Sequence, residues 1–177
     1  MDEMEEQAFV SLAESRRINR TDLPDELARF YSNYEGNGLG TEANLQIARL
    51  NEVKKVRWTD LYPTVPEGWE EFSGFLIGNS SYGDYVIYVI SAPGIKVGAV
   101  LAIGKTELYG PAGDNENGPE NTLVLAESFD LWVRRLCKLG CAAHGMFLYL
   151  DIPGWMNDLI KSEISALNPH SRYWATI

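Results

Sequence analysis

Apolar side chains recur every three or four positions in the first part of the chain, which is the spacing of one buried helix face. Between positions 21 and 38 this stripe consists of Leu23, Leu27, Phe30, Tyr31 and Tyr34. Thr21 or Asp22 is the expected N-cap of the helix, and Gly36 or Gly38 is expected to end it. A similar pattern over residues 4–17 predicts an amphipathic helix that precedes it.

The middle of the chain changes to short runs of β-branched and aromatic residues bounded by Gly, Pro, Asn and Ser, a pattern that predicts strands. The runs are LQIARL, GFLIGNSS, YVIYVIS, KVGAVLAI and TLVLA. The stretch NEVKKVRW, which follows the first run, is expected to be a short helix or a turn. The connections NSSYGD and APGI are short enough for hairpins, so neighbouring strands should be antiparallel.

Helical spacing returns near the C-terminus. Ser128 is the expected cap of a helix over FDLWVRRLCKLG, and a last helix should end before Pro169. The order of elements predicts an α+β fold, an antiparallel β-sheet (a meander) with helices packed at the N- and C-terminal ends. We expect a single domain over residues 1–177, with residues 140–177 as a candidate C-terminal extension.

Composition narrows the classes of partner. The chain has 177 residues, 45% of them hydrophobic, and a formal net charge of -10 with a pI near 4.6. This charge repels phosphate backbones and anionic membranes, so we expect no nucleic acid and no membrane as partners and favour a basic protein partner. The N-terminus lacks the pattern of a secretory signal, and two cysteines are too few for a disulfide framework. We therefore expect a cytoplasmic protein.

Residues that could carry chemistry are few. Cys137, Cys141 and His144 form C-x3-C-x2-H, whereas a zinc site needs four ligands, so buried or half-buried thiols are the favoured interpretation. The sequence GNGLG follows a predicted helix and opens a strand, the reverse of a dinucleotide-binding turn. We expect neither a metal nor a cofactor. Catalysis by Cys141 and His144 remains an open alternative.

Several short patterns occur together in an order typical of one known family. They are Glu14, Leu23-Pro24, Phe30-Tyr31, Asn37-Gly38, Gly78 with Gly83-Asp84-Tyr85, and Ser128-Phe129. On these residues the chain resembles the SUKH superfamily of Smi/Knr-like proteins, from Phe9 to Leu139. The loop GPAGDNENGPEN is longer than the family pattern, and the segment from Gly140 to Ile177 has no counterpart in it.

The resemblance implies a protein-binding module and not an enzyme. Many bacterial members are immunity proteins that neutralise a cognate toxin, often a nuclease, and eukaryotic members resemble regulatory scaffolds. Carboxylates and tyrosines in the predicted sheet loops would then contact the toxin. The candidate contact residues are Glu35, Asn37, Tyr82, Asp84, Asp114, Glu116 and Glu120. A regulatory scaffold without a toxin partner, and an enzyme that uses Cys141 and His144, are the alternatives.

Overall fold

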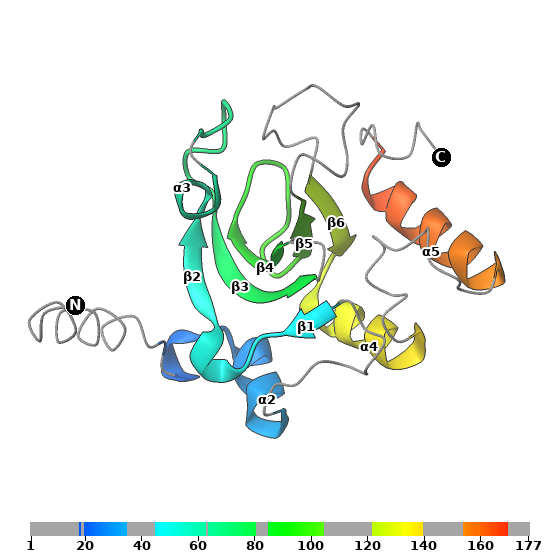
Figure 1. Ribbon diagram of the computed structural model, residues 1–177, viewed down its shortest axis with the longest axis horizontal. Coiled ribbons are helices and arrows are strands. Elements are labelled where there is room, and N and C mark those ends of the chain that lie inside the picture. The colour runs from blue at the N-terminus through cyan, green and yellow to red at the C-terminus, as the bar shows by residue number, and fades with distance from the viewer. Residues whose placement is uncertain are drawn as a thin grey trace, which may run out of the picture.

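The computed structural model describes residues 18, 20–34, 45–62, 64–80, 85–104, 122–139 and 154–169 (Figure 1). Its helical elements are η1 (Arg20–Asp22), α2 (Asp25–Asn33), η2 (Leu50–Glu52), α3 (Trp58–Leu61), α4 (Phe129–Leu139) and α5 (Gly154–Leu167). Its strands are β1 (Leu45–Ile47), β2 (Lys54–Arg57), β3 (Ser73–Ser80), β4 (Tyr85–Ser91), β5 (Val100–Ile103) and β6 (Thr122–Ala126). The helix expected over residues 4–17 lies outside the described residues.

The six strands form one antiparallel sheet in the order β1-β3-β4-β5-β6, with β2 paired to β3 as well. The predicted α+β fold and its meander are therefore confirmed. Both β1 and β2 pair with the same edge of β3, because β4 occupies the other edge. Ile47 pairs with Gly78 and Lys54 with Leu76, so residues 49–53 form an excursion that interrupts this edge strand.

Each face of the curled sheet carries its own hydrophobic core. One core joins Phe75, Ile77 and Tyr88 to α2, α4 and α5, which Figure 1 shows outside the curl. The other core joins Ile87 and Leu101 to α3 and the connector that follows it. Three of the five tryptophans, Trp58, Trp69 and Trp132, lie in these cores. Burial of two sheet faces explains why the central strands read as continuous apolar runs.

The helix termini follow the sequence in part. Ser128 caps α4 as predicted, because its Oγ accepts a hydrogen bond from the Leu131 N–H at 3.3 Å. At α2 the prediction is wrong, since the helix begins at Asp25 after an extended Pro24 and has no side-chain cap. Proline at the N-cap position, with its fixed φ, precedes the first helical residue. The helix also ends at Asn33, before the glycines that were expected to stop it.

The stretch NEVKKVRW is a strand over half its length, and not only a helix or turn. Only Val56 in β2 is buried, while Lys54, Lys55 and Arg57 are exposed. With one apolar residue in four, the strand has no hydrophobic alternation to predict it, and its conformation follows from pairing with β3. The strand expected over KVGAVLAI is shorter than predicted and begins at Val100.

The last described helix is joined to the sheet. Ile164 of α5 is fully buried in the same core as α2 and α4, and the helix ends at Leu167, before Pro169 as predicted. Arg135 of α4 donates a hydrogen bond to the Leu125 carbonyl and forms an ion pair of 2.8 Å with Glu163. Residues 140–153 and 170–177 lie outside the description, and a domain boundary at 140 stays a prediction.

Candidate binding surface

All seven candidate contact residues lie outside the described residues. Glu35 and Asn37 fall in residues 35–44, Tyr82 and Asp84 in 81–84, and the remaining three in 105–121. The structure therefore does not show how these side chains are arranged. It does place the residues that flank the three segments, and their positions in the sheet are informative.

The flanking residues meet at one end of the sheet. Leu45 pairs with Ser80, and a continuous row of paired residues crosses the sheet beside them. In this row Asn79 pairs with Tyr85, Tyr85 with Ile103, and Ile103 with Thr122. All three segments therefore join the sheet at the same end. Residues 35–44 lead into β1, residues 81–84 connect β3 to β4, and residues 105–121 connect β5 to β6. We call this end of the sheet the anchor row, defined by Leu45, Ser80, Tyr85, Ile103 and Thr122.

Most of the chain's net charge lies in the three anchored segments. Together they contain seven carboxylic acids and one lysine, a net charge of -6 out of -10 for the chain. The acids are Glu35, Glu42, Asp84, Glu107, Asp114, Glu116 and Glu120. The described residues that flank these three segments all lie at one end of the sheet.

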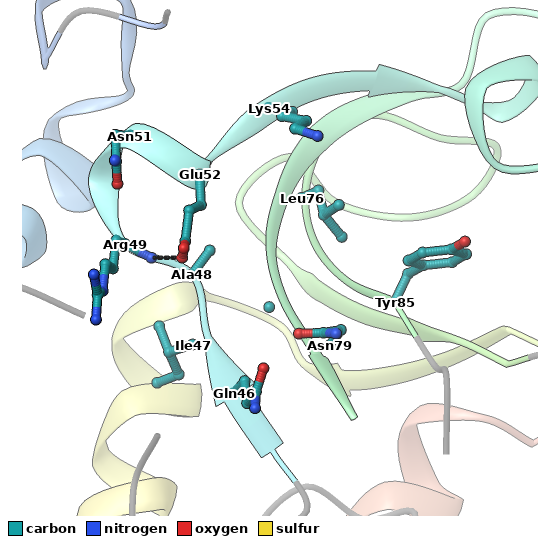
Figure 2. Close-up of a pocket in the computed structure, with 11 residues that line it drawn as sticks. Gln46, Ile47, Ala48, Arg49, Asn51, Glu52, Lys54, Leu76, Asn79 and Tyr85 are labelled. Carbon is teal, nitrogen blue, oxygen red and sulfur yellow. Dashed lines mark hydrogen bonds between the residues drawn. The ribbon is translucent and has the colours of Figure 1, made fainter. Parts of the chain in front are cut away.

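A groove of about 680 Å³ opens where the excursion at 49–53 leaves the sheet (Figure 2). We call it the notch groove. Side chains from β1, β3 and β4 line it, among them Gln46, Leu76, Asn79 and Tyr85, and Lys54 and Arg49 flank it. Gln46 and Asn79 are cross-strand partners and lie together in Figure 2, with Tyr85 beyond them. Two amides, a phenol and a lysine suit hydrogen bonding to a polar chain.

Glu52, which lines this groove, and Asp60, which lies beyond it at α3, both accept hydrogen bonds from the backbone. Glu52 Oε2 accepts a hydrogen bond from the Arg49 N–H at 2.8 Å, which is the dashed line in Figure 2. Asp60 Oδ2 accepts from the Arg57 N–H at the same distance, 2.8 Å. Each acid thus closes the first turn of a short helix, η2 or α3. The arrangement leaves both arginine side chains exposed on the surface.

A second groove, of about 660 Å³, runs along β2. We call it the edge groove. Residues from both faces of the strand line it, with Lys54 and Val56 from one face and Lys55 and Arg57 from the other. Leu61, Leu76 and Tyr85 form its apolar side. Three cations (Lys54, Lys55 and Arg57) and two acids (Asp22 and Asp60) line it, so its formal charge is positive on a protein that is acidic as a whole.

Two tyrosines, Tyr31 and Tyr88, have a raised pKa, and both contribute to the hydrophobic core. Burial raises the pKa of Tyr31 above its usual value, with smaller contributions from Tyr34 and Glu52. Burial also raises the pKa of Tyr88, and its hydroxyl donates a 2.7 Å hydrogen bond to Glu26 Oε1. A phenol with a raised pKa stays neutral near pH 7, so neither residue is set up as a base or a nucleophile.

The described residues hold no group of three or more His, Cys, Asp or Glu that could bind a metal ion. Cys141 and His144 lie outside them, so the catalytic alternative stays untested. Cys137 was expected to be buried or half-buried, and this is wrong, because it lies exposed on α4. Its position follows from the helix face, since Trp132 and Leu136 take the buried positions. Within the same ranges, no helix has the length and apolarity needed to cross a membrane.

No protein-family model matches the chain, and no curated protein or solved structure is detectably similar to it. The resemblance to the SUKH superfamily thus stays a hypothesis that depends on sequence patterns alone.

Sequence reasoning missed the two grooves. Their main signal was local: Arg49-x-x-Glu52 and Arg57-x-x-Asp60 both have the spacing of a first helical turn closed by an acid. These two turns enclose the only described lysine pair, Lys54-Lys55. The cross-strand pair of Gln46 and Asn79 gave no signal, because it depends on strand register.

Proposed function

We propose that the protein is a non-catalytic protein-binding module, an immunity protein that neutralises a cognate toxin of the nuclease type. The observation that carries the proposal is the anchor row. Three segments with a combined net charge of -6 are attached to one end of a rigid sheet. A nuclease presents a basic surface to nucleic acid, and an acidic protein surface complements it.

The sheet supplies the rigidity that such an interface requires. Residues of the anchor row are held in the sheet by pairing on both sides of Tyr85 and Ile103, and Ile103 is fully buried. Loops held by a rigid scaffold lose less conformational freedom on binding than free segments do. Tyr82, if it contacts the toxin, would add a large rigid side chain with a hydroxyl at modest entropic cost.

A neutralisation assay tests the proposal. The protein is mixed with the purified toxin domain encoded next to its gene, and nuclease activity is measured on plasmid DNA at increasing inhibitor concentration. We expect stoichiometric inhibition. The triple variant Asp114→Asn, Glu116→Gln, Glu120→Gln should weaken inhibition about tenfold or more, since several charge pairs at a steered interface are removed.

The matched control removes the same charge elsewhere. Glu67, Glu70 and Glu71 are exposed in the connector after α3, and their replacement by Gln changes the net charge equally. This control should weaken inhibition less than about threefold, because distant exposed charges act only through the screened field. Equal loss in both variants would contradict a binding surface at the anchor row, and intact nuclease activity at tenfold excess of inhibitor would contradict the function itself.

A further inference from the structure

We infer that the edge groove binds an acidic, extended segment of a partner protein, which joins the sheet as an added strand beside β2. Extended peptides join sheets in this way, and main-chain hydrogen bonds give affinity while alternate side chains give specificity. The inference concerns a second surface, which has only Tyr85 in common with the anchor row, and a partner of the opposite charge.

The backbone of β2 is available on one side. β2 pairs with β3, from Lys54 opposite Leu76 to Arg57 opposite Ser73. Among the residues that the structure describes, no strand pairs with its other edge. The edge groove includes residues from both faces of the strand, so it follows this edge itself and not just one face. Edge strands expose N–H and C=O groups that can pair with another strand.

The charge of the β2 side chains determines which kind of partner strand could be added. Lysine on a short edge strand is a common device that prevents pairing with other sheets. The same cations attract a segment of opposite sign, because Lys54, Lys55 and Arg57 are all exposed along β2. The groove also contains Asp22 and Asp60. Asp60 accepts a hydrogen bond from the Arg57 backbone and lies 3.7 Å from the Arg57 guanidinium, so these two charges partly offset each other, and Lys54 and Lys55 are the main attraction for an acidic strand.

The two faces of β2 favour different side chains on an added strand. On one face an added strand would lie beside Lys55 and Arg57, and on the other beside Lys54 and Val56, with Leu61 and Leu76 further along the groove. Leu76 and Leu61 are half-buried, so a neighbour could cover more of their apolar surface. Because side chains alternate along a strand, acidic residues at every second position with apolar residues between them fit both faces.

The site shares only Tyr85 with the anchor row and otherwise lies toward the other end of β3. β2 pairs with residues 73–76 of β3, whereas the anchor row contains Ser80, at the other end of that strand. Variants of the two surfaces can therefore be compared in one protein. Loss at one surface does not require loss at the other, and failure of the immunity proposal would leave this inference standing.

The test uses three fluorescent octapeptides and the full chain. The first alternates Glu and Val, the second alternates Lys and Val, and the third repeats the first with N-methyl groups at alternate backbone nitrogens. N-methylation keeps the charge and removes the N–H groups that pair strands. By fluorescence anisotropy at 50 mM NaCl, we expect the Glu-Val peptide to bind. The other two should bind about tenfold or more weakly.

Protein variants locate the site. Lys54→Glu with Lys55→Glu should raise the Kd of the Glu-Val peptide about tenfold or more, since two exposed attractions become repulsions. Lys96→Glu with Arg134→Glu changes the net charge equally at exposed positions away from the groove and should change the Kd less than about twofold. Circular dichroism checks that each variant folds. Lys54→Gln with Lys55→Gln gives a milder second variant with an intermediate loss.

Four results would overturn the inference. They are absence of peptide binding at 1 mM, equal binding of the N-methylated peptide, tighter binding of an oligothymidine of equal charge, and self-association that the Lys54 and Lys55 variants abolish. The second result would leave a charged patch without strand addition. The third would assign the groove to nucleic acid, and the fourth to a second copy of this chain.

Discussion

The Asn168 side chain pairs with the Val124 backbone as a strand would. Its Oδ1 accepts a hydrogen bond from the Val124 N–H at 2.6 Å, and its Nδ2 donates to the Val124 carbonyl at 2.9 Å. Nδ2 also donates to the Ile164 carbonyl, at 2.7 Å. Asn168 is only 8% exposed. One amide thus satisfies both backbone groups of Val124 in β6 and a carbonyl of α5, which closes the edge of the sheet at Val124.

Replacing Asn168 should destabilise the fold strongly. Asn168→Ala leaves the N–H and carbonyl of Val124 without this partner, and we expect the free energy of unfolding to fall by about 2–3 kcal/mol. Urea unfolding measures the change. Asn33→Ala is the matched control, since the Asn33 amide donates to the Arg29 carbonyl on an exposed helix surface. That variant should lose less than about 1 kcal/mol, and an equal loss in both would contradict the edge-closing role.

Asn168→Asp should make stability depend on pH. The new carboxylate would face the carbonyls of Val124 and Ile164, which repel its charged form and accept a hydrogen bond from its neutral form. Its pKa in the folded state should therefore lie above the unfolded value of about 3.9. Folding then favours the protonated form, so the deficit against the wild type should be smallest at low pH and grow as pH rises. Urea unfolding at pH 5 and pH 8 checks the sign.

Two tyrosines offer a contrast between a paired and an unpaired hydroxyl. The Tyr88 hydroxyl is bonded to Glu26, whereas the buried Tyr31 hydroxyl has no hydrogen-bond partner in the described part of the chain. Tyr88→Phe should therefore cost about 1–2 kcal/mol, and Tyr31→Phe should be neutral or stabilising. Equilibrium unfolding of the two variants compares them directly. A larger loss for Tyr31→Phe would show that its hydroxyl has a partner.

The same tyrosines predict a loss of stability in alkali. The pKa of each is raised above its ordinary value of about 10, chiefly by burial. A raised folded-state pKa means that the neutral form is favoured by folding, so stability is complete below about pH 10 and declines above it. Urea unfolding between pH 8 and pH 11 should show this decline. The decline of stability with pH should be shallower in Tyr31→Phe and in Tyr88→Phe than in the wild type. An identical pH dependence in all three proteins would contradict the assignment of the decline to these two tyrosines.

Local sequence signals predicted the elements that carry their own pattern. Ser128 before an apolar helix face and the runs that form β3 and β4 could be recognised without knowledge of the fold. β2 could not, because pairing with β3 determines its conformation. Closure of the β6 edge joins Asn168 to a residue 44 positions earlier, and the anchor row depends on register across five strands. Such relations are set by tertiary packing, which residue periodicity does not encode.

Gly78 permits the close pairing of β1 with β3. A Cβ at this position would lie 2.6 Å from the backbone oxygen of Gln46, and that oxygen cannot rotate away. Gly78→Ala should therefore push β1 outward and destabilise the fold by about 2–3 kcal/mol. Gly94→Ala is the control, because Gly94 has a φ of +66° but nothing within 4 Å of a built Cβ. It should cost about 1 kcal/mol from backbone strain alone.

Amide hydrogen exchange separates the two glycine variants further. In Gly78→Ala the Ala48 N–H, which donates to the Ile77 carbonyl at 2.9 Å, should exchange faster, because β1 has moved from its partner. In Gly94→Ala the Ala48 N–H should keep the protection from exchange that the global stability of this variant predicts. Unchanged protection in both variants would show that β3 and β1 adjust to the methyl group without separating.

If the protein binds a basic toxin as proposed, salt should control how fast the two proteins associate. The anchored segments carry a net charge of -6, and the screening length falls from about 14 Å at 50 mM salt to about 4 Å at 500 mM. Electrostatic steering should therefore make the association rate constant fall about tenfold or more over this range, while the dissociation rate changes far less. Stopped-flow fluorescence with the neighbouring toxin domain measures both. The variant lacking charge at Asp114, Glu116 and Glu120 should start from a slower rate and show a weaker salt dependence. A salt-independent association rate in the wild type would remove the electrostatic argument and leave shape alone to explain recognition.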